Sequence, residues 1–195
     1  MVIKDPVRNI VNQTALPEGF PTHAHESEFW ESLGRTVATF GFLEEVLLKA
    51  IFAFTATTEY SEDEIEEAYS KWVPKLERSL SDQLGSLIDT YGKSVRDNLS
   101  ATIENLDVLL NDLRAASKIR NVLCHGSWRM PDSNGKSVPF FVNRQKEIFE
   151  TPIDVSFLNQ VQKHAVELTC AVINTVTHMG WQFPSCNGVG EPVWS

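Results

Sequence analysis

The sequence has few cysteines and no long apolar run, and each absence excludes a class of protein. Its three cysteines, Cys124, Cys170 and Cys186, are an odd number without paired spacing, so no disulfide framework and no zinc site is predicted. No apolar stretch approaches the roughly 18 residues of a membrane span. The N-terminus lacks the basic region and long apolar stretch of a signal peptide, so we expect a cytoplasmic protein. No Gly-rich phosphate loop or His-Glu-x-x-His motif is present, and no metal or cofactor is expected.

What is present is an ordinary globular composition with an excess of acid. The 195 residues are 42% hydrophobic and 22% charged, which fits one domain. The net charge of −9 argues against nucleic acid. From Arg114 to Lys146, however, seven basic residues face the single acid Asp132, a local charge of +6 that leaves −15 on the remainder. Two interpretations stay open: a positive face on an acidic body, or acid that only keeps the protein soluble.

Apolar residues recur at helical spacing in most of the chain. The pattern predicts an all-α, up-and-down bundle of four to five helices. The expected helices cover about 26–57, 62–72, 74–92, 94–123 and 154–180. Pro74 is expected in the first turn of the third helix, and Gly180 at the end of the last.

The remaining segments divide the chain into an arm, one domain, an insertion and a tail. Residues 1–25 are rich in proline and predict an extended N-terminal arm. Residues 26–180 predict a single helical domain. Within it, 127–153 combine a turn signal with β-prone residues, which predicts a small β-hairpin inserted before the last helix. Residues 181–195 form a C-terminal tail, in which three aromatic residues are expected to pack back on the domain: Trp181, Phe183 and Trp194.

Two charged residues interrupt the apolar stripes of the predicted helices. Glu44 stands on the stripe of the first helix, and Arg120 ends the stripe of the fourth. A charge on a buried seam costs several kcal/mol unless it is paired and hydrogen-bonded. We therefore expect Glu44 and Arg120 to meet or to line one polar cleft. The alternatives are a small rotation that puts Glu44 at the boundary of the helix, and an Arg120 that only serves the helix end.

The segment Arg120-Asn121-Val122-Leu123-Cys124-His125-Gly126 follows at the end of the fourth helix. Gly126 is expected to end this helix in a left-handed conformation. Asn121 and His125 are four residues apart and share a face, whereas Arg120 and His125 lie on neighbouring sides. An arginine fork suits phosphate, and histidine moves protons near neutral pH. The alternative is a helix end at which both basic residues serve the dipole.

This segment, at the end of a long amphipathic helix, resembles the motif of the HEPN superfamily (higher eukaryotes and prokaryotes nucleotide-binding domain). That motif reads Arg, four to six residues, then His, and it maps to Arg120, Asn121 and His125. The resemblance implies a homodimer in which two motif segments meet. It further implies, in active members, a metal-independent endoribonuclease of the toxin, phage-defence or RNA-processing type. Glu44 is the candidate for a supporting acid.

Further residues are candidates for contacts with RNA or for packing only. The candidates for RNA binding are Arg114, Lys118, Trp128 and Arg129. The aromatic residues Trp128, Phe140, Phe141 and Phe149 could stack bases, or could pack the hairpin on the bundle. A helix C-terminus does not activate a thiol, so Cys124 is not expected to act. We expect His23 and His25 to be solvated, and His164 and His178 to lie at the edge of the core.

Two functions follow from these observations. The first is a dimeric HEPN-like endoribonuclease that uses Arg120, His125 and Asn121. The alternative is a non-catalytic interaction module of the same fold, such as an immunity, antitoxin-like or regulatory protein, that uses its acidic surface against a basic partner. The intact motif and the local charge of +6 favour the first function, and the net charge favours the second.

Overall fold

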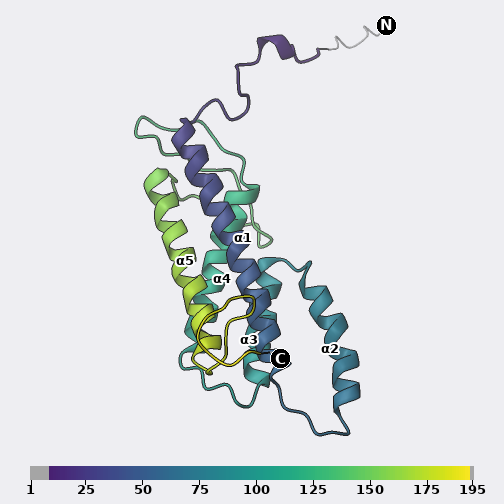
Figure 1. Cartoon of the computed structure of the whole chain (residues 1–195). Helices are drawn as coiled ribbons and strands as arrows, with labels where there is room; N and C mark the ends of the chain where they lie inside the picture. The colour runs from purple at the N-terminus through teal and green to yellow at the C-terminus, as the bar shows by residue number, and fades with distance from the viewer. Residues whose placement is uncertain (1–8, 194–195) are drawn as a thin grey trace, which may run out of the picture.

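The structure is a computed structural model that describes residues 9–193. It confirms the expected all-α fold: consecutive helices alternate in direction, and no strand forms among the described residues (Figure 1). After a short 3-10 turn at Gln13–Ala15, the helices are α1 Ser27–Ala56, α2 Ile65–Ser79, α3 Leu84–Asp97, α4 Leu106–His125 and α5 Val155–Thr177. None of the helices in this part of the chain is long and apolar enough to cross a membrane.

The long helix α1 is the centre of the bundle. It packs along α5 and α3, and its predicted stripe is confirmed, with five of its members buried: Leu33, Phe40, Leu47, Ile51 and Phe54. The hydroxyl of Thr36 donates to the carbonyl oxygen of Leu158 at 3.2 Å, which ties α1 to α5. The Asp154 carboxylate accepts the N–H of Phe157 at 2.8 Å, so α5 begins with a side-chain cap where the sequence predicts it.

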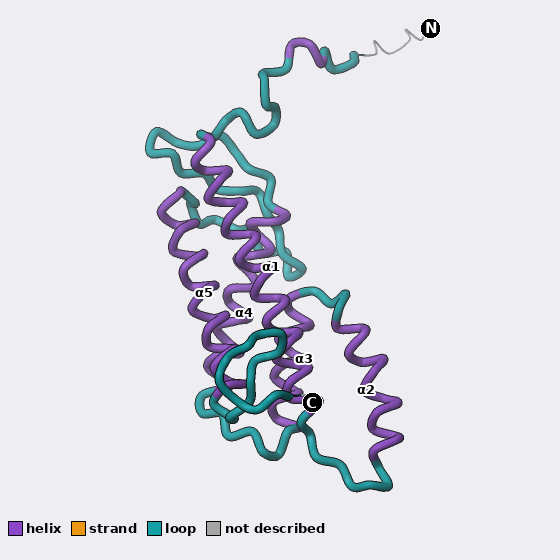
Figure 2. Tube along the Cα trace, in the orientation of Figure 1, coloured by secondary structure: helices purple, strands orange, loops and turns teal. Residues whose placement is uncertain are grey.

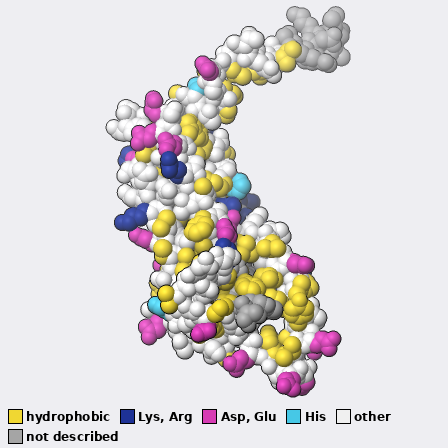
Figure 3. Space-filling model, viewed as in Figure 1, with side chains coloured by type: hydrophobic (Ala, Val, Ile, Leu, Met, Phe, Trp, Pro, Cys, Tyr) yellow, Lys and Arg dark blue, Asp and Glu magenta, His cyan; other side chains and the backbone are white. Residues whose placement is uncertain are grey.

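Helix α2 lies beside the bundle rather than within it (Figure 2). Ser79 is its only buried residue in the described chain. Trp72 joins it to α1 by donating from Nε1 to the Thr55 hydroxyl at 2.8 Å. Acidic side chains surround the lower end of the molecule near α2, where hydrophobic side chains are also exposed (Figure 3).

The expected boundary at Pro74 is wrong, because Pro74 lies inside α2. The chain instead breaks between α2 and α3, where the N–H groups of Ser81 and Asp82 bond back over three residues to Arg78 and Ser79. Serine and aspartate compete with helical hydrogen bonding and favour turns. One predicted helix over 74–92 is therefore replaced by the end of α2 and most of α3.

The expected helix over 94–123 also begins too early. Asn98 is 3% exposed, and its side-chain amide donates to the Phe54 carbonyl at 2.9 Å, at the end of α1. Its side-chain oxygen accepts the N–H of Ser100 at 3.1 Å. Asn98 therefore ends α3 and closes the C-terminus of α1, whose last carbonyls need partners. Leu99, expected on a buried stripe, is 98% exposed, and α4 begins only at Leu106.

The β-hairpin expected over 127–153 does not form. The segment holds only isolated antiparallel bridges, which join Ser127 to Phe140, Val142 to Ile148, and Ser137 to Ile153. These bridges do not continue into one ladder. Prolines at 131, 139 and 152 lack the N–H that a ladder requires. The segment is a loop that covers the end of the bundle at which α4 ends and α5 begins (Figure 1).

The arm and the tail differ in how they contact the bundle. Described arm residues such as Ile10 and Val11 are exposed, at 96% and 75%. The arm is joined to α1 where Trp30 Nε1 donates to the Thr22 carbonyl at 2.8 Å. In the tail Phe183 is buried, and the ring of Trp181 lies 5.8 Å from that of Phe54. The expected packing of Trp194 falls outside the described residues.

Candidate functional site

Arg120 and Glu44 form an ion pair between α4 and α1. Arg120 Nη2 donates to Glu44 Oε1 at 3.0 Å, and the two side chains are 24% and 25% exposed. The pairing predicted from the two interrupted stripes is therefore present. Its cause is the one inferred from the sequence: each charge faces the bundle, and each neutralises the other there. Glu44 fixes the guanidinium at the surface of the core.

Asn121 contacts the same guanidinium from the adjacent position on α4. Arg120 Nη1 lies 3.4 Å from Asn121 Oδ1, a long hydrogen bond. A guanidinium carries five N–H donors. Glu44 and Asn121 each accept one, so other donors are left for an anion. At about a quarter exposed, the Arg120 side chain is positioned by its partners and still reaches solvent.

His125 is the last residue of α4, and it is exposed. In the described chain its side chain makes no hydrogen bond or ion pair with another residue. Five residues of helix turn the chain by about 140° and advance it by about 7.5 Å. Arg120 therefore faces α1 while His125 faces outward, with Asn121 on the side between them. The two groups reach one ligand only beyond the end of α4 or with a second copy.

Gly126 ends α4, but not in the expected left-handed conformation. Its φ of −70° and ψ of 138° are extended. A Cβ at this position would lie 2.6 Å from the Val122 carbonyl oxygen and 2.8 Å from Pro139 Cβ. The glycine is therefore required by a close approach of the loop to the helix end. This contact brings Pro139 and its neighbour Phe140 directly against the motif.

The four candidates for RNA contact have different surroundings. Arg114 pairs with Asp89 of α3 at 2.8 Å, whereas Lys118 is exposed and makes no ion pair in the described chain. Trp128 packs against Phe29 at 4.9 Å between ring centres. The guanidinium of Arg129 lies over the Phe140 ring at 5.2 Å. Lys118 and Arg129 remain accessible, while Arg114 is engaged and Trp128 is half-buried.

His25 is partly buried rather than fully solvated, contrary to expectation. It stacks on Phe29 at 4.2 Å and meets the edges of Trp30 and Trp128. Its buried Nε2 has no hydrogen-bond partner in the described chain, and burial lowers its pKa from 6.5. The spacing of His25 and Phe29, four apart across the start of α1, was the only signal of this cluster in the sequence. His23 is exposed.

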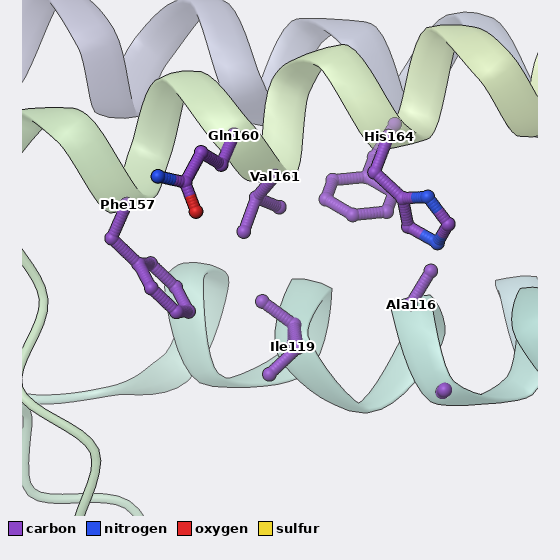
Figure 4. A pocket seen from close by; sticks show the side chains of 8 residues that line it. Ala116, Ile119, Phe157, Gln160, Val161 and His164 are labelled. Carbon is purple, nitrogen blue, oxygen red and sulfur yellow. The ribbon is translucent and has the colours of Figure 1, made fainter.

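A groove of about 250 Å³ lies between α4 and α5 (Figure 4). Phe157, Gln160, Val161 and His164 of α5 face Ala116 and Ile119 of α4 across it. A second cleft, of about 480 Å³, lies between α2 and the ends of α1 and α3. Neither hollow is lined by Arg120, Asn121 or His125. The two histidines expected at the core edge are both exposed: His164 on the groove and His178 after α5.

No group of three His, Cys, Asp or Glu side chains converges as metal ligands would among residues 9–193. No protein-family model, curated protein or solved structure matches the chain. The site offers three groups: a fixed guanidinium with free donors, an amide beside it, and an exposed imidazole about one turn further along α4.

Proposed function

We propose that the chain is a HEPN-like, metal-independent endoribonuclease that acts as a dimer through Arg120, Asn121 and His125. One observation carries the proposal: Glu44 holds the motif arginine at the end of α4 at 3.0 Å, beside Asn121 and one turn before an exposed histidine. Glu44 and Asn121 accept hydrogen bonds from two of the five N–H donors of Arg120, so donors remain for a phosphate.

The chemistry is attack of a ribose 2′-hydroxyl on the adjacent phosphorus. One His125 takes the 2′-hydroxyl proton while the O2′–P bond forms, and a second His125 gives a proton to the 5′-oxygen as the P–O5′ bond breaks. Arg120 donates to the non-bridging oxygens, where negative charge develops. The products are a 2′,3′-cyclic phosphate and a free 5′-hydroxyl. DNA lacks the attacking hydroxyl and serves as an inert analogue.

The directions of the two side chains support the proposed dimer. In one chain Arg120 faces α1 and His125 faces outward, and neither hollow of the single chain contains them. A second copy that packs against this end of α4 would bring two arginines and two histidines to one cleft. It would also supply a second histidine, which protonates the 5′-oxygen faster than water does.

The test incubates labelled single-stranded RNA in EDTA with the wild type and with Arg120→Ala, His125→Ala and Asn121→Ala variants. We expect cleavage by the wild type, products with 2′,3′-cyclic phosphate ends, and a loss of at least about 100-fold in the arginine and histidine variants. Matched controls come from the opposite end of the bundle. His178→Ala removes another exposed histidine, and Arg96→Ala removes an arginine paired with Asp107.

A folded wild type that cleaves no RNA, or variants that cleave as well as the wild type, would contradict the proposal. The second candidate function, a non-catalytic interaction module, would then be favoured. The observation that supports an interaction module is the net charge of −9, with acidic residues concentrated near α2. Such a surface suits a basic protein partner better than a nucleic acid.

A further inference from the structure

Phe140 is an exposed aromatic residue held against the end of α4. Its backbone exchanges two hydrogen bonds with Ser127, at 2.9 and 2.8 Å. Its side chain is nevertheless 51% exposed. Ser127 follows His125 by two residues, so the exchange fixes Phe140 within a few ångströms of the motif. A ring that had only to pack the loop on the bundle would face inward.

The other aromatic residues of the loop are arranged differently. Trp128 belongs to the cluster around Phe29, and Phe141 and Phe149 pack against the core. Phe140 alone among these four is open to solvent. The structure thus distinguishes two roles that the sequence left open. Three of the aromatic side chains pack the loop on the bundle, and the side chain of Phe140 is exposed to solvent.

Arg129 contacts the exposed ring of Phe140. Its guanidinium lies over the Phe140 ring at 5.2 Å from the centre, the geometry of a cation–π contact. Two planar groups are therefore held together at the surface. Arginine planes and aromatic rings are the two surfaces on which unpaired bases stack.

Further basic residues belong to the loop that holds Phe140 and to the end of α4. Arg144 and Lys146 make no ion pair in the described chain, and Lys118 lies on α4 two residues before the motif. Two of the three acids of the same loop are engaged locally, whereas Glu150 is exposed and makes no ion pair in the described chain. The Asp132 carboxylate accepts the N–H groups of Asn134 and Lys136, which lowers the pKa of Asp132. The Glu147 carboxylate accepts a hydrogen bond from Asn143.

We propose that Arg129 and Phe140 form a platform on which single-stranded RNA stacks one base as it enters the Arg120–His125 site. This inference rests on the proposed function for its substrate and adds how that substrate is held. The class is single-stranded RNA because a duplex keeps its base faces stacked and hidden. A basic protein partner is the less suitable occupant, since the Arg129 guanidinium lies against the exposed ring and would repel it.

Binding can be measured without cleavage. In a His125→Ala background, the Kd for a fluorescein-labelled single-stranded RNA of about 12 nucleotides is read by anisotropy. Loss of one base–aromatic stack weakens binding by about tenfold or more, which is the result expected for Phe140→Ala. Phe140→Trp should bind as the parent does or more tightly. Arg129→Ala should weaken binding, and high salt should weaken it in every variant.

Phe42 provides a matched control. It is an exposed phenylalanine of α1, at 52% against 51% for Phe140, and Phe42→Ala should leave the Kd unchanged. Circular dichroism checks the fold of each variant, and Phe140→Trp keeps the test informative if the alanine variant unfolds. A double-stranded RNA of the same sequence should compete poorly.

The outcomes separate the two proposals. RNA affinity that falls in Phe140→Ala while no chain cleaves RNA would support the platform and reject the endoribonuclease. Cleavage that depends on Arg120 and His125 while Phe140→Ala binds normally would support the enzyme and overturn the platform. Equal affinity in all variants, or none in the parent, would also overturn it and leave the exposed ring to a protein partner.

Discussion

The ion pair between Arg120 and Glu44 makes an energetic prediction that is independent of activity. Charge-assisted hydrogen bonds that are partly removed from water contribute about 1.5–3 kcal/mol. At a quarter exposed, this pair should couple its residues more strongly than a surface pair. A double-mutant cycle of Glu44→Ala and Arg120→Ala, followed by urea unfolding, should give a coupling of about 1–2 kcal/mol.

The chain contains its own reference for that cycle. Glu31 and Arg35 form an exposed pair four residues apart on α1, at 2.8 Å, with side chains 64% and 67% exposed. Pairs of this kind contribute about 0.3–0.5 kcal/mol. A coupling at Glu44 and Arg120 no larger than the one at Glu31 and Arg35 would mean that the motif arginine is not held by its partner.

Gly126 is needed for space rather than for its backbone conformation. A methyl group would press on the Val122 carbonyl and on Pro139, so Gly126→Ala should destabilise the fold by about 1–3 kcal/mol. Gly34 lies in α1 with open space around it, and Gly34→Ala should stabilise the fold by about 0.5–1 kcal/mol. Thermal unfolding of the two variants would show opposite shifts. A Gly126→Ala protein as stable as the parent would contradict the close approach.

His25 makes stability depend on pH. Burial lowers its pKa in the folded protein below the ordinary value of 6.5, so the unfolded chain binds the proton more readily. The contribution of His25 to stability is complete above about pH 6.5 and is lost as the pH falls from there through the lower pKa of the folded protein. Urea unfolding between pH 5 and 8 should show a steeper loss at low pH for the parent than for His25→Gln. The exposed His178→Gln should keep the parent's profile, and parallel profiles for all three proteins would reject the assignment.

At the scale of the elements, α2 is the least supported helix. One of its residues is buried, whereas twelve are buried in α1. Local opening costs least where little apolar surface is covered. Hydrogen exchange should therefore be faster for the amides of α2 than for those in the middle of α1 and α5, under conditions in which the global fold is intact. Equal protection in α2 and α1 would show that α2 opens only with the whole bundle.

How far the sequence predicts a helix depends on what decides where that helix begins and ends. The bounds of α1 and α5 followed from long, regular stripes. The helices between them were misplaced because single polar side chains decided the breaks. Asn98 is the clearest case: it follows the last residue of α3, and its side-chain amide donates to a carbonyl at the end of α1. That partner lies 44 residues away, so no local pattern contains it.

In the candidate site, too, the residues with a periodic signal were predictable and those fixed by distant contacts were not. Glu44 and Arg120 were predictable as a pair because both interrupt regular stripes, which is a periodic signal. The platform of Arg129 and Phe140 and the burial of His25 were not. Each depends on how a loop or an arm folds back on the bundle, and alternation in the sequence does not record that geometry.

At the scale of the whole molecule, the proposed dimer predicts complementation. Coexpressed Arg120→Ala and His125→Ala chains would form mixed dimers in which one arginine and one histidine remain. We expect the coexpressed pair to recover a small part of the RNA cleavage that each variant lacks alone, because the remaining His125 takes the 2′-hydroxyl proton and water gives a proton to the 5′-oxygen. Light scattering should give twice the mass of one 21.9 kDa chain. A mass of one chain would contradict the dimer, and mixtures as inactive as their components would contradict a site shared between two subunits.

The two hydrogen bonds between Ser127 and Phe140 have a consequence for where an RNA would be cut. Because they join the loop to the residue two places after His125, the stacked base and the proton carrier belong to one rigid body. The distance between them is then constant along the bound strand. Such an enzyme would cut at a fixed number of nucleotides from the base that it stacks. Its preferred cleavage sites would then depend on the identity of that base rather than on the nucleotides at the cut.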